Sequence, residues 1–388
     1  MNQEIQPSPG IETSPAETSM FSRRRFLRKA GVVGAALPVA GGLVAAACYN
    51  DPTGGPIDSS AVPTQNVKPG ATQAPAATQA PADLWVKIDE DHKKGVVDFL
   101  RQQKAPITKG KGMQELAPRI ENGVKVFDLT IDNVDWEVSP GLIEKARGYN
   151  NQIPGPTLRA TVGDKVRINV KNNLEESSSV HWHGLLVPNA MDGVPYLTQD
   201  PIVPGGTFVY EFTIRNAGSH MYHSHHNSAD QVNRGLLGAF IILPEDRSKY
   251  PQYDKEYILI MNDSLLGFTI NGKGFPATDA LIAKKGERVL IRWMNEGMMY
   301  HPMHLHGATM EVFQRDGYPV EPPYICDTID VPPGNRFDCI IHANDAGLWA
   351  FHCHVLSHAE YEGGFFGLVT VLAVEDETFK VADLLATV

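Results

Sequence analysis

The sequence is short of basic residues, and this shortage excludes one broad class of partner. Its 388 residues include 34 lysines and arginines against 45 aspartates and glutamates, which gives a formal net charge of −11. A protein that binds nucleic acid needs basic side chains to meet the phosphates. Because no basic stripe interrupts the acidic background, nucleic acid is not an expected partner. The length suits two domains of ordinary size and is short for three.

Long apolar runs are also scarce, and the one that stands out lies near the N-terminus. It spans residues 30–47 and follows a basic string with three consecutive arginines at 23–25. The run is about long enough to span a membrane, but glycines and Pro38 interrupt it and small residues end it. This arrangement resembles a twin-arginine export signal, so we expect residues 1–47 to be a signal peptide and the protein to act outside the cytoplasm.

Cysteine is rare, with four residues in the whole chain. The first, Cys48, follows Ala45-Ala46-Ala47, and this string resembles a lipoprotein cleavage site in which the cysteine receives a lipid. Such a lipid is the only membrane attachment we expect. Because Ala45 stands where these sites usually have leucine, simple cleavage after Ala47 remains the alternative. Residues 1–47 contain five basic and three acidic side chains, so the remainder of the chain carries a net charge of −13.

Residues 48–83 lack the apolar side chains that a folded core needs. They are rich in Pro, Thr and Ala and repeat the same six residues at 71–76 and 77–82, so we expect a disordered, semi-extended tether. Residues 84–120 form an N-terminal extension. Within it, the spacing of Val96, Val97 and Leu100 predicts a packing helix over Asp89–Gln103.

After Glu121 the sequence consists of short alternating runs separated by Gly, Pro and Asn. Many short strands at such spacing are typical of β-sandwiches. We therefore expect an all-β protein with one sandwich domain over residues 121–244 and a second over residues 255–388, joined at Pro244–Asp254. The predicted strands are Lys125–Ile131, Lys165–Val170, Thr207–Ile214, Ala239–Leu243, Tyr257–Met261, Arg288–Trp293, Thr309–Phe313, Phe337–His342 and Gly367–Val374.

Ten of the 14 histidines fall in four tight groups, two in each expected domain. Each group contains a His-X-His pair, and residues i and i+2 of a strand point to the same face. Four such pairs offer eight neutral nitrogen ligands, a set that suits copper or zinc better than calcium or magnesium. The groups consist of His181 and His183; His223 and His225; His301, His304 and His306; and His352, His354 and His358.

Cys353 lies between His352 and His354, and this position indicates which metal is bound. Because side chains alternate along a strand, Cys353 faces one side and the two histidines face the other. A thiolate with two imidazoles, here from His301 and His358, is the ligand set of a blue-copper electron-transfer site. The His-Cys-His string would also connect this copper to a second metal site through a few covalent bonds. A structural zinc site would need no such connection.

These motifs, in this order, resemble those of multicopper oxidases of the two-domain, laccase-like type over roughly residues 121–375. The framework strings at 151–156 and 331–334 resemble that family too. The resemblance implies two cupredoxin-like Greek-key β-sandwich domains and four coppers per subunit. His301, Cys353 and His358 would hold the type 1 copper, and His181 and His304 the type 2 copper. The type 3 pair would take His183, His223, His225, His306, His352 and His354.

The resemblance implies an enzyme that couples one-electron oxidation of a small reductant to reduction of O₂ to water. A phenolic or aromatic reductant is the first expectation, and Cu(I), Mn(II) or Fe(II) is the alternative. Met298, Met299 and Met303 suit either a Cu(I) site or ordinary packing. Copper nitrite reductases, which also have two cupredoxin domains, carry the cysteine in the first domain and are excluded. A non-catalytic copper-binding scaffold remains an alternative, although no ligand is missing.

Two further positions near the motifs concern the axial side of the type 1 copper and the supply of protons. The family's weak axial methionine stands ten residues after the cysteine, where this chain has Gly363. With a loop two residues longer, Phe365 takes the axial place as a non-ligand, and loss of the thioether should raise the reduction potential. Asp192 stands where laccases carry an acid that relays protons to reduced oxygen. A turn aspartate before Gly193 is the alternative interpretation.

Two further expectations concern covalent and subunit connections. Cys326 and Cys339 flank a Pro-Pro-Gly-Asn turn, and a simple hairpin would place them opposite each other for a disulfide; two buried thiols are the alternative.

The short connection between domains need not bring their histidines together. The resemblance therefore implies a homotrimer in which the first domain of one subunit meets the second domain of the next, with the trinuclear clusters at the interfaces.

The ligand role of Cys353 gives a direct spectroscopic prediction. The copper-loaded protein should be intensely blue, because thiolate-to-copper charge transfer produces this colour in such sites. The Cys353→Ser protein should lose both the blue absorption and substrate oxidation. A Cys353→Ser protein that stays blue would contradict the assignment.

Overall fold

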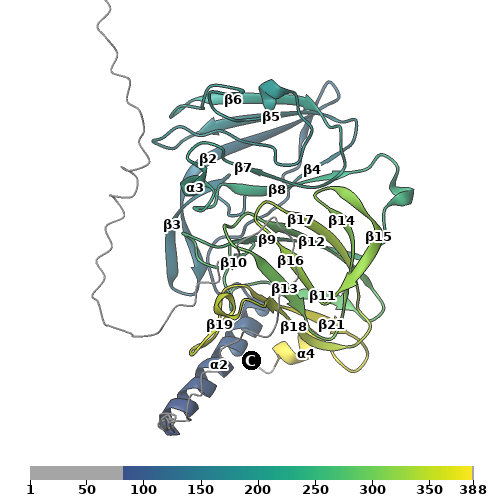
Figure 1. The fold of residues 1–388 in the computed structure, drawn as a ribbon. Coiled ribbons are helices and arrows are strands. Elements are labelled where there is room, and N and C mark those ends of the chain that lie inside the picture. Colours follow the sequence, from purple (N-terminus) through teal and green to yellow (C-terminus); the bar gives the residue numbers. More distant parts are fainter. Residues whose placement is uncertain (1–81, 387–388) are drawn as a thin grey trace, which may run out of the picture. The chain divides into compact units, whose positions relative to one another are not determined.

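The computed structural model describes residues 82–386, and within them the fold is almost entirely β (Figure 1). The predicted signal peptide, Cys48 and the tether up to Pro81 lie outside the described residues. The first domain contains two sheets. The larger sheet comprises β1 (Arg119–Glu121), β2 (Val124–Ser139), β3 (Leu142–Tyr149), β5 (Lys165–Asn172) and β6 (Thr207–Thr213), and the smaller comprises β4 (Leu158–Thr161), β7 (Gly218–His223) and β8 (Leu237–Leu243).

The second domain also contains two large sheets. One has the order β10-β9-β12-β17-β14-β15 and the other the order β11-β21-β18-β13-β16. The first comprises β9 (Lys255–Asn262), β10 (Thr269–Ile270), β12 (Arg288–Asn295), β14 (Met310–Arg315), β15 (Tyr318–Cys326) and β17 (Arg336–His342). The second comprises β11 (Leu281–Lys284), β13 (His301–Leu305), β16 (Thr328–Val331), β18 (Gly347–Cys353) and β21 (Val369–Glu375).

The remaining elements are short, apart from one helix. They are α2 (Ala82–Lys104), η1 (Asn189–Met191), α3 (Ser228–Gln231), η2 (Arg247–Lys249), η3 (Leu356–His358), the hairpin strands β19 (Glu360–Tyr361) and β20 (Gly364–Phe365), and α4 (Val381–Leu385). All nine predicted strands coincide with observed strands, so the all-β expectation is confirmed. Each domain has its own apolar core, with Trp182 fully buried in the first and Trp293 in the second.

Helix α2 is longer than the sequence pattern predicted. The predicted helix began at Asp89, whereas α2 begins at Ala82. Its last two turns pack on the second domain, where Phe99 stacks on Phe275. In its first turns the apolar side chains of Leu84, Trp85 and Val86 are 41%, 60% and 58% exposed. Within the described part of the chain, no helix is long and apolar enough to cross a membrane.

Of the two alternatives for Cys326 and Cys339, the structure has two free thiols and no disulfide between them; Cys339 is buried and Cys326 is half-buried. The disulfide alternative assumed that the strands carrying the two cysteines pair directly. Instead, β14 lies between β15 and β17, with Met310 opposite Cys326 and Val312 opposite Cys339. The chain between the two cysteines passes through β16, which belongs to the other sheet.

A buried ionic network connects the two domains. Arg292 of the second domain donates to Asp338 at 2.8 Å and to Glu256 at 2.6 Å, and it also donates to Ser219 of the first domain at 2.9 Å. Ser219 in turn donates to Asp338 at 2.6 Å. Arg292 and Asp338 are each only 1% exposed. The first-domain strand β7, which carries His223, is thus tied to the second domain by charge-assisted hydrogen bonds.

Replacing Arg292 by an uncharged residue should destabilise the folded protein. The Arg292→Met protein leaves Asp338 buried without its partner, and we expect the free energy of unfolding to fall by about 3–5 kcal/mol. Chemical denaturation of the copper-free protein measures this. Arg119→Met, which breaks an exposed pair with Asp128, is the matched control and should have little effect. An equal effect of the two substitutions would contradict a stabilising role for the network.

Candidate metal centre

Strands β13 and β18 carry two groups of ligands on opposite faces of one sheet. They pair antiparallel, with Met303 opposite Cys353 and His304 opposite His352. Cys353 therefore points into the apolar core, where it is fully buried. His352 on the same strand and His304 on the partner strand are only partly buried and belong to the other face. The alternation that the His-Cys-His string predicted is thus present.

The inward group is a compact set of one thiol and two imidazoles. The Sγ atom of Cys353 lies 3.8 Å from Nδ1 of His301 and 3.6 Å from Nδ1 of His358. The three donor atoms all lie within 4.8 Å of one another. Burial raises the pKa of the Cys353 thiol to about 11, so the copper-free thiol is protonated at neutral pH. A thiophilic metal that displaces this proton fits the donor set.

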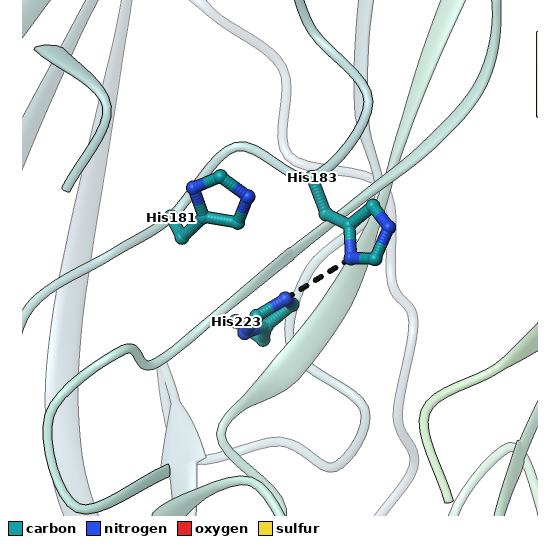
Figure 2. A group of neighbouring side chains, drawn as sticks. All are labelled: His181, His183 and His223. Atoms are coloured by element: carbon teal, nitrogen blue, oxygen red, sulfur yellow. Dashed lines mark hydrogen bonds between the residues drawn. The ribbon is translucent and has the colours of Figure 1, made fainter. Parts of the chain in front are cut away.

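In the first domain, His181, His183 and His223 converge (Figure 2). The Nδ1 atom of His183 lies 3.2 Å from Nε2 of His223. Backbone oxygens orient two of the rings: His181 Nδ1 donates to the carbonyl of Asp192 at 2.8 Å, and His223 Nδ1 donates to that of Ser224 at 3.0 Å. These bonds place the hydrogen of both rings on Nδ1, so Nε2 carries the lone pair that can bind a metal; in His223 that lone pair faces Nδ1 of His183.

The electrostatics of this group favour neutral imidazoles. Burial, with Arg336 as the next contribution, lowers the pKa of His183 to about 2. Burial also lowers the pKa of His223 to about 4. His225, the fourth member, is exposed, and its ring centroid lies 5.5 Å from that of His181. Because metals bind the neutral form of histidine, the rings of His183 and His223 are ready to bind a metal near neutral pH.

The second domain gathers its own four histidines on the outward face of β13 and β18. Nε2 of His306 lies 3.1 Å from Nε2 of His352. His304 Nδ1 donates to Thr328 Oγ1 at 2.9 Å, and His352 Nδ1 donates to the carbonyl of Cys353 at 3.0 Å. The ring of His354 lies 5.5 Å from that of His304. A surface hollow of about 700 Å³ borders His304 and His306.

The eight outward histidines form two separate groups of four, which we call the first-domain and second-domain tetrads. The first consists of His181, His183, His223 and His225, and the second of His304, His306, His352 and His354. Among residues 82–386, no hydrogen bond or ring contact joins a histidine of one tetrad to a histidine of the other. Within one chain, therefore, the eight histidines lie in two separate groups, and the eight-ligand cluster stays a prediction.

Of the two remaining predicted site residues, Asp192 lies beside one of the tetrads, whereas Phe365 makes no ring contact with the inward histidines. The carboxylate of Asp192 lies 3.5 Å from Nδ1 of His181, so it is adjacent to the first-domain tetrad. Phe365 is 37% exposed, and its ring contacts Phe275 and His92. In the described part of the chain, no ring contact joins Phe365 to His301 or His358. Its axial role stays a prediction.

Sequence reasoning missed two residues that contact the inward ligands. Phe268 stacks on His358 with ring centroids 4.3 Å apart and approaches His301 edge-on at 6.5 Å. The carboxylate of Asp263 lies 2.6 Å from Nε2 of His301. Asp263 and His301 are separated by 38 residues, and no local spacing connects them. Asp263 directly follows the predicted strand Tyr257–Met261 and Asn262, a weak signal that alone would not have identified it.

Comparison with known proteins places the chain in a family. Sequence models described as multicopper oxidase match residues 130–247 and 249–375. The solved multicopper oxidase mgLAC is 35% identical, with a TM-score of 0.63 over 66% of this chain and 89% of that one. The chain belongs to the multicopper oxidase family, and its two domains are cupredoxin-like.

Two curated proteins that are similar to this chain carry different names. A Copper resistance protein A homolog of Pseudomonas syringae pv. tomato is 28% identical over 58% of this chain and 48% of its own length. Laccase-1 of Cryptococcus neoformans var. neoformans serotype D is 30% identical over 50% of this chain and 38% of its own length. The chain thus spans about half or less of these relatives' lengths.

The lowered pKa values of the first-domain tetrad predict acid sensitivity of the copper-free protein. Below about pH 6.5 the unfolded chain takes up protons at histidine, whereas folded His183 and His223 resist protonation until pH about 2 and about 4. The free energy of unfolding should therefore fall as the pH drops from 6.5 to 4, by roughly 1 kcal/mol per pH unit for each such histidine.

Replacing one of these histidines by a residue that does not titrate tests this. His183→Gln should reduce the slope of unfolding free energy against pH, measured by denaturant titration at several pH values. His342→Gln, at a histidine that is 47% exposed, is the matched control for the loss of one histidine. Equal slopes for the His183→Gln and unmodified proteins would show that burial does not keep His183 neutral.

Proposed function

We propose that this protein is a laccase-like multicopper oxidase that oxidises a small reductant in one-electron steps and reduces O₂ to water. One observation carries this proposal. Cys353 belongs to the inward ligand group, and its two chain neighbours belong to the second-domain tetrad. An electron that arrives at the inward site therefore has a path of a few covalent bonds to the outward site. A copper-storage protein needs no such path, although all the ligands would serve it.

Copper bound at these residues would supply the redox chemistry, with one ion at the inward site and three at the outward site. The inward site would be type 1, held by His301, Cys353 and His358. His181 and His304 would hold the type 2 ion, and the other six outward histidines would hold the type 3 pair. The protein orients these side chains through the hydrogen bonds of their second nitrogens. Asp192, beside His181, would hold and deliver protons.

The surroundings of His358 favour an aromatic reductant over a metal ion. Phe268 stacks on His358, Phe366 packs edge-on against Phe268 at 6.1 Å, and Tyr361 packs edge-on against Phe366 at 5.2 Å. Tyr361 is 60% exposed. A phenol can stack on such a surface. For Cu(I), the alternative, the exposed thioether of Met298 is a soft donor, but Asn233 already donates to its sulfur at 3.2 Å.

The separation of the two tetrads supports an assembly of several subunits. Each is partly exposed and holds half of the ligands, so a complete cluster requires the first-domain tetrad of one subunit to meet the second-domain tetrad of another. A head-to-tail contact forms a ring when its rotation closes, and we propose a ring of three. Export by the twin-arginine route and a lipid on Cys48 complete the proposal and rest on the sequence motifs alone.

Mixing two inactive proteins tests the shared cluster. His183→Ala disables the first-domain tetrad and His354→Ala disables the second-domain tetrad. In trimers co-expressed from both genes, random assembly should leave about a quarter of the interface clusters with all eight ligands. Oxygen uptake should then return to about a quarter of the unmodified rate. If each cluster formed within one chain, the mixture would remain inactive, as would each variant expressed alone.

A panel of reductants tests the substrate class. Oxygen uptake should show a higher kcat/KM for phenols than for Cu(I), Fe(II) or Mn(II). Tyr361→Ala should raise KM for phenols, because the stacking surface is lost, while Met298→Leu should leave the phenol kinetics unchanged. A higher kcat/KM for Cu(I), reduced by Met298→Leu, would instead identify a cuprous oxidase. Copper-loaded protein that consumes no oxygen with any donor would contradict the oxidase proposal itself.

A further inference from the structure

A buried carboxylate holds one ligand of the inward site by its far nitrogen. Asp263 follows β9, and its Oδ2 atom lies 2.6 Å from Nε2 of His301. The side chains of Asp263 and His301 are 1% and 0% exposed. Water therefore does not weaken this contact, and a charge at Asp263 acts through a medium of low polarity.

The surrounding backbone is built around this carboxylate. The Met298 N–H donates to Oδ1 of Asp263 at 2.9 Å, and the Met299 N–H donates to Oδ2 at 3.1 Å. A Cβ atom at Gly297 would lie only 2.0 Å from Oδ2, so the loop approaches the carboxylate as closely as glycine allows. Three donors, including His301, thus meet the two oxygens, as an ionised carboxylate requires.

The contact determines which nitrogen of His301 faces the metal. A carboxylate can only accept, so Nε2 of His301 carries the hydrogen. Nδ1 then presents its lone pair towards Cys353 Sγ, 3.8 Å away. Hydrogen bonds of this kind fix the ring orientation of metal-binding histidines and increase their basicity. Among residues 82–386, no lysine or arginine forms an ion pair with Asp263, so its charge is not neutralised locally.

We propose that Asp263 is a positioning residue that orients His301 and lowers the reduction potential of the type 1 copper. This inference rests on the proposed function for the presence of copper. A fixed negative charge stabilises the oxidised site, which carries one more positive charge than the reduced site. A more basic imidazole acts in the same direction. The predicted absence of an axial thioether raises the potential, so Asp263 opposes that effect and adjusts the site towards reductants of lower potential.

The Asp263→Asn protein tests the charge while nearly keeping the shape. Potentiometric titration of the blue absorption should show the Cu(II)/Cu(I) equilibrium shifted at least tenfold towards Cu(I) at a fixed poise, which corresponds to about 59 mV for one electron. Glu362→Gln is the matched control, because it removes an exposed charge four residues after His358, and solvent screening should keep its shift much smaller. An unchanged or lowered potential in Asp263→Asn, with the blue band intact, would overturn the proposal.

Two further measurements apply if the amide variant fails to fold or to take up copper. Asp263→Ser, which is smaller and retains an acceptor, should show a potential shift of the same sign. In the unmodified copper-free protein, histidine-selective ¹⁵N NMR at alkaline pH should show the His301 proton on Nε2. A proton on Nδ1 would overturn the orienting role. Because this spectrum needs neither copper nor activity, it separates failure of this inference from failure of the proposed oxidase.

Discussion

The alternation of side chains along β13 and β18 is the constraint on which the site depends. It places Cys353 in the apolar core of the second domain and its two neighbours on the opposite face of the same sheet. One short strand therefore separates a dry, buried site from a partly exposed one. The neighbouring strand β13 has the same alternation, with Met303 opposite Cys353 and His304 opposite His352. A slip of one residue in either strand would move every ligand to the wrong face.

The two faces have different environments, and these suit different tasks. The inward ligands are enclosed by aromatic rings and by Asp263, so electrostatic effects there are strong and solvent reorganisation is small. The outward tetrads are oriented mainly by backbone oxygens and remain partly exposed, so they are open to further ligands. The network of Arg292, Asp338 and Ser219 ties β7 to the second domain, and in this way one tetrad is held relative to the other domain without contacting its tetrad.

The sequence alone predicted whatever depended on local periodicity. The His-X-His pairs and the His-Cys-His string show which side chains share a face of a strand, so the histidine groups could be predicted. The alternating apolar and polar runs predicted nine strands. Contacts across distant parts of the chain could not. Phe268 stacks on a histidine 90 residues later. The sequence also left open whether Cys326 and Cys339 form a disulfide, because it did not show that β14 separates their strands. The first turns of α2 were not predicted, and their apolar side chains Leu84, Trp85 and Val86 remain exposed; the pair Lys87–Asp91 stabilises these turns locally.

In the proposed oxidase, β13, β18 and η3 of each chain carry a complete electron-transfer site, while each chain holds half of the ligands of each of two oxygen-reducing sites. Anomalous X-ray diffraction at the copper absorption edge, from crystals of the copper-loaded protein, tests this most directly. The account predicts one copper among His301, Cys353 and His358 of each chain, and three coppers between the first-domain tetrad of one subunit and the second-domain tetrad of its neighbour. Three coppers bridging both tetrads of a single chain, or no copper between tetrads at all, would contradict it.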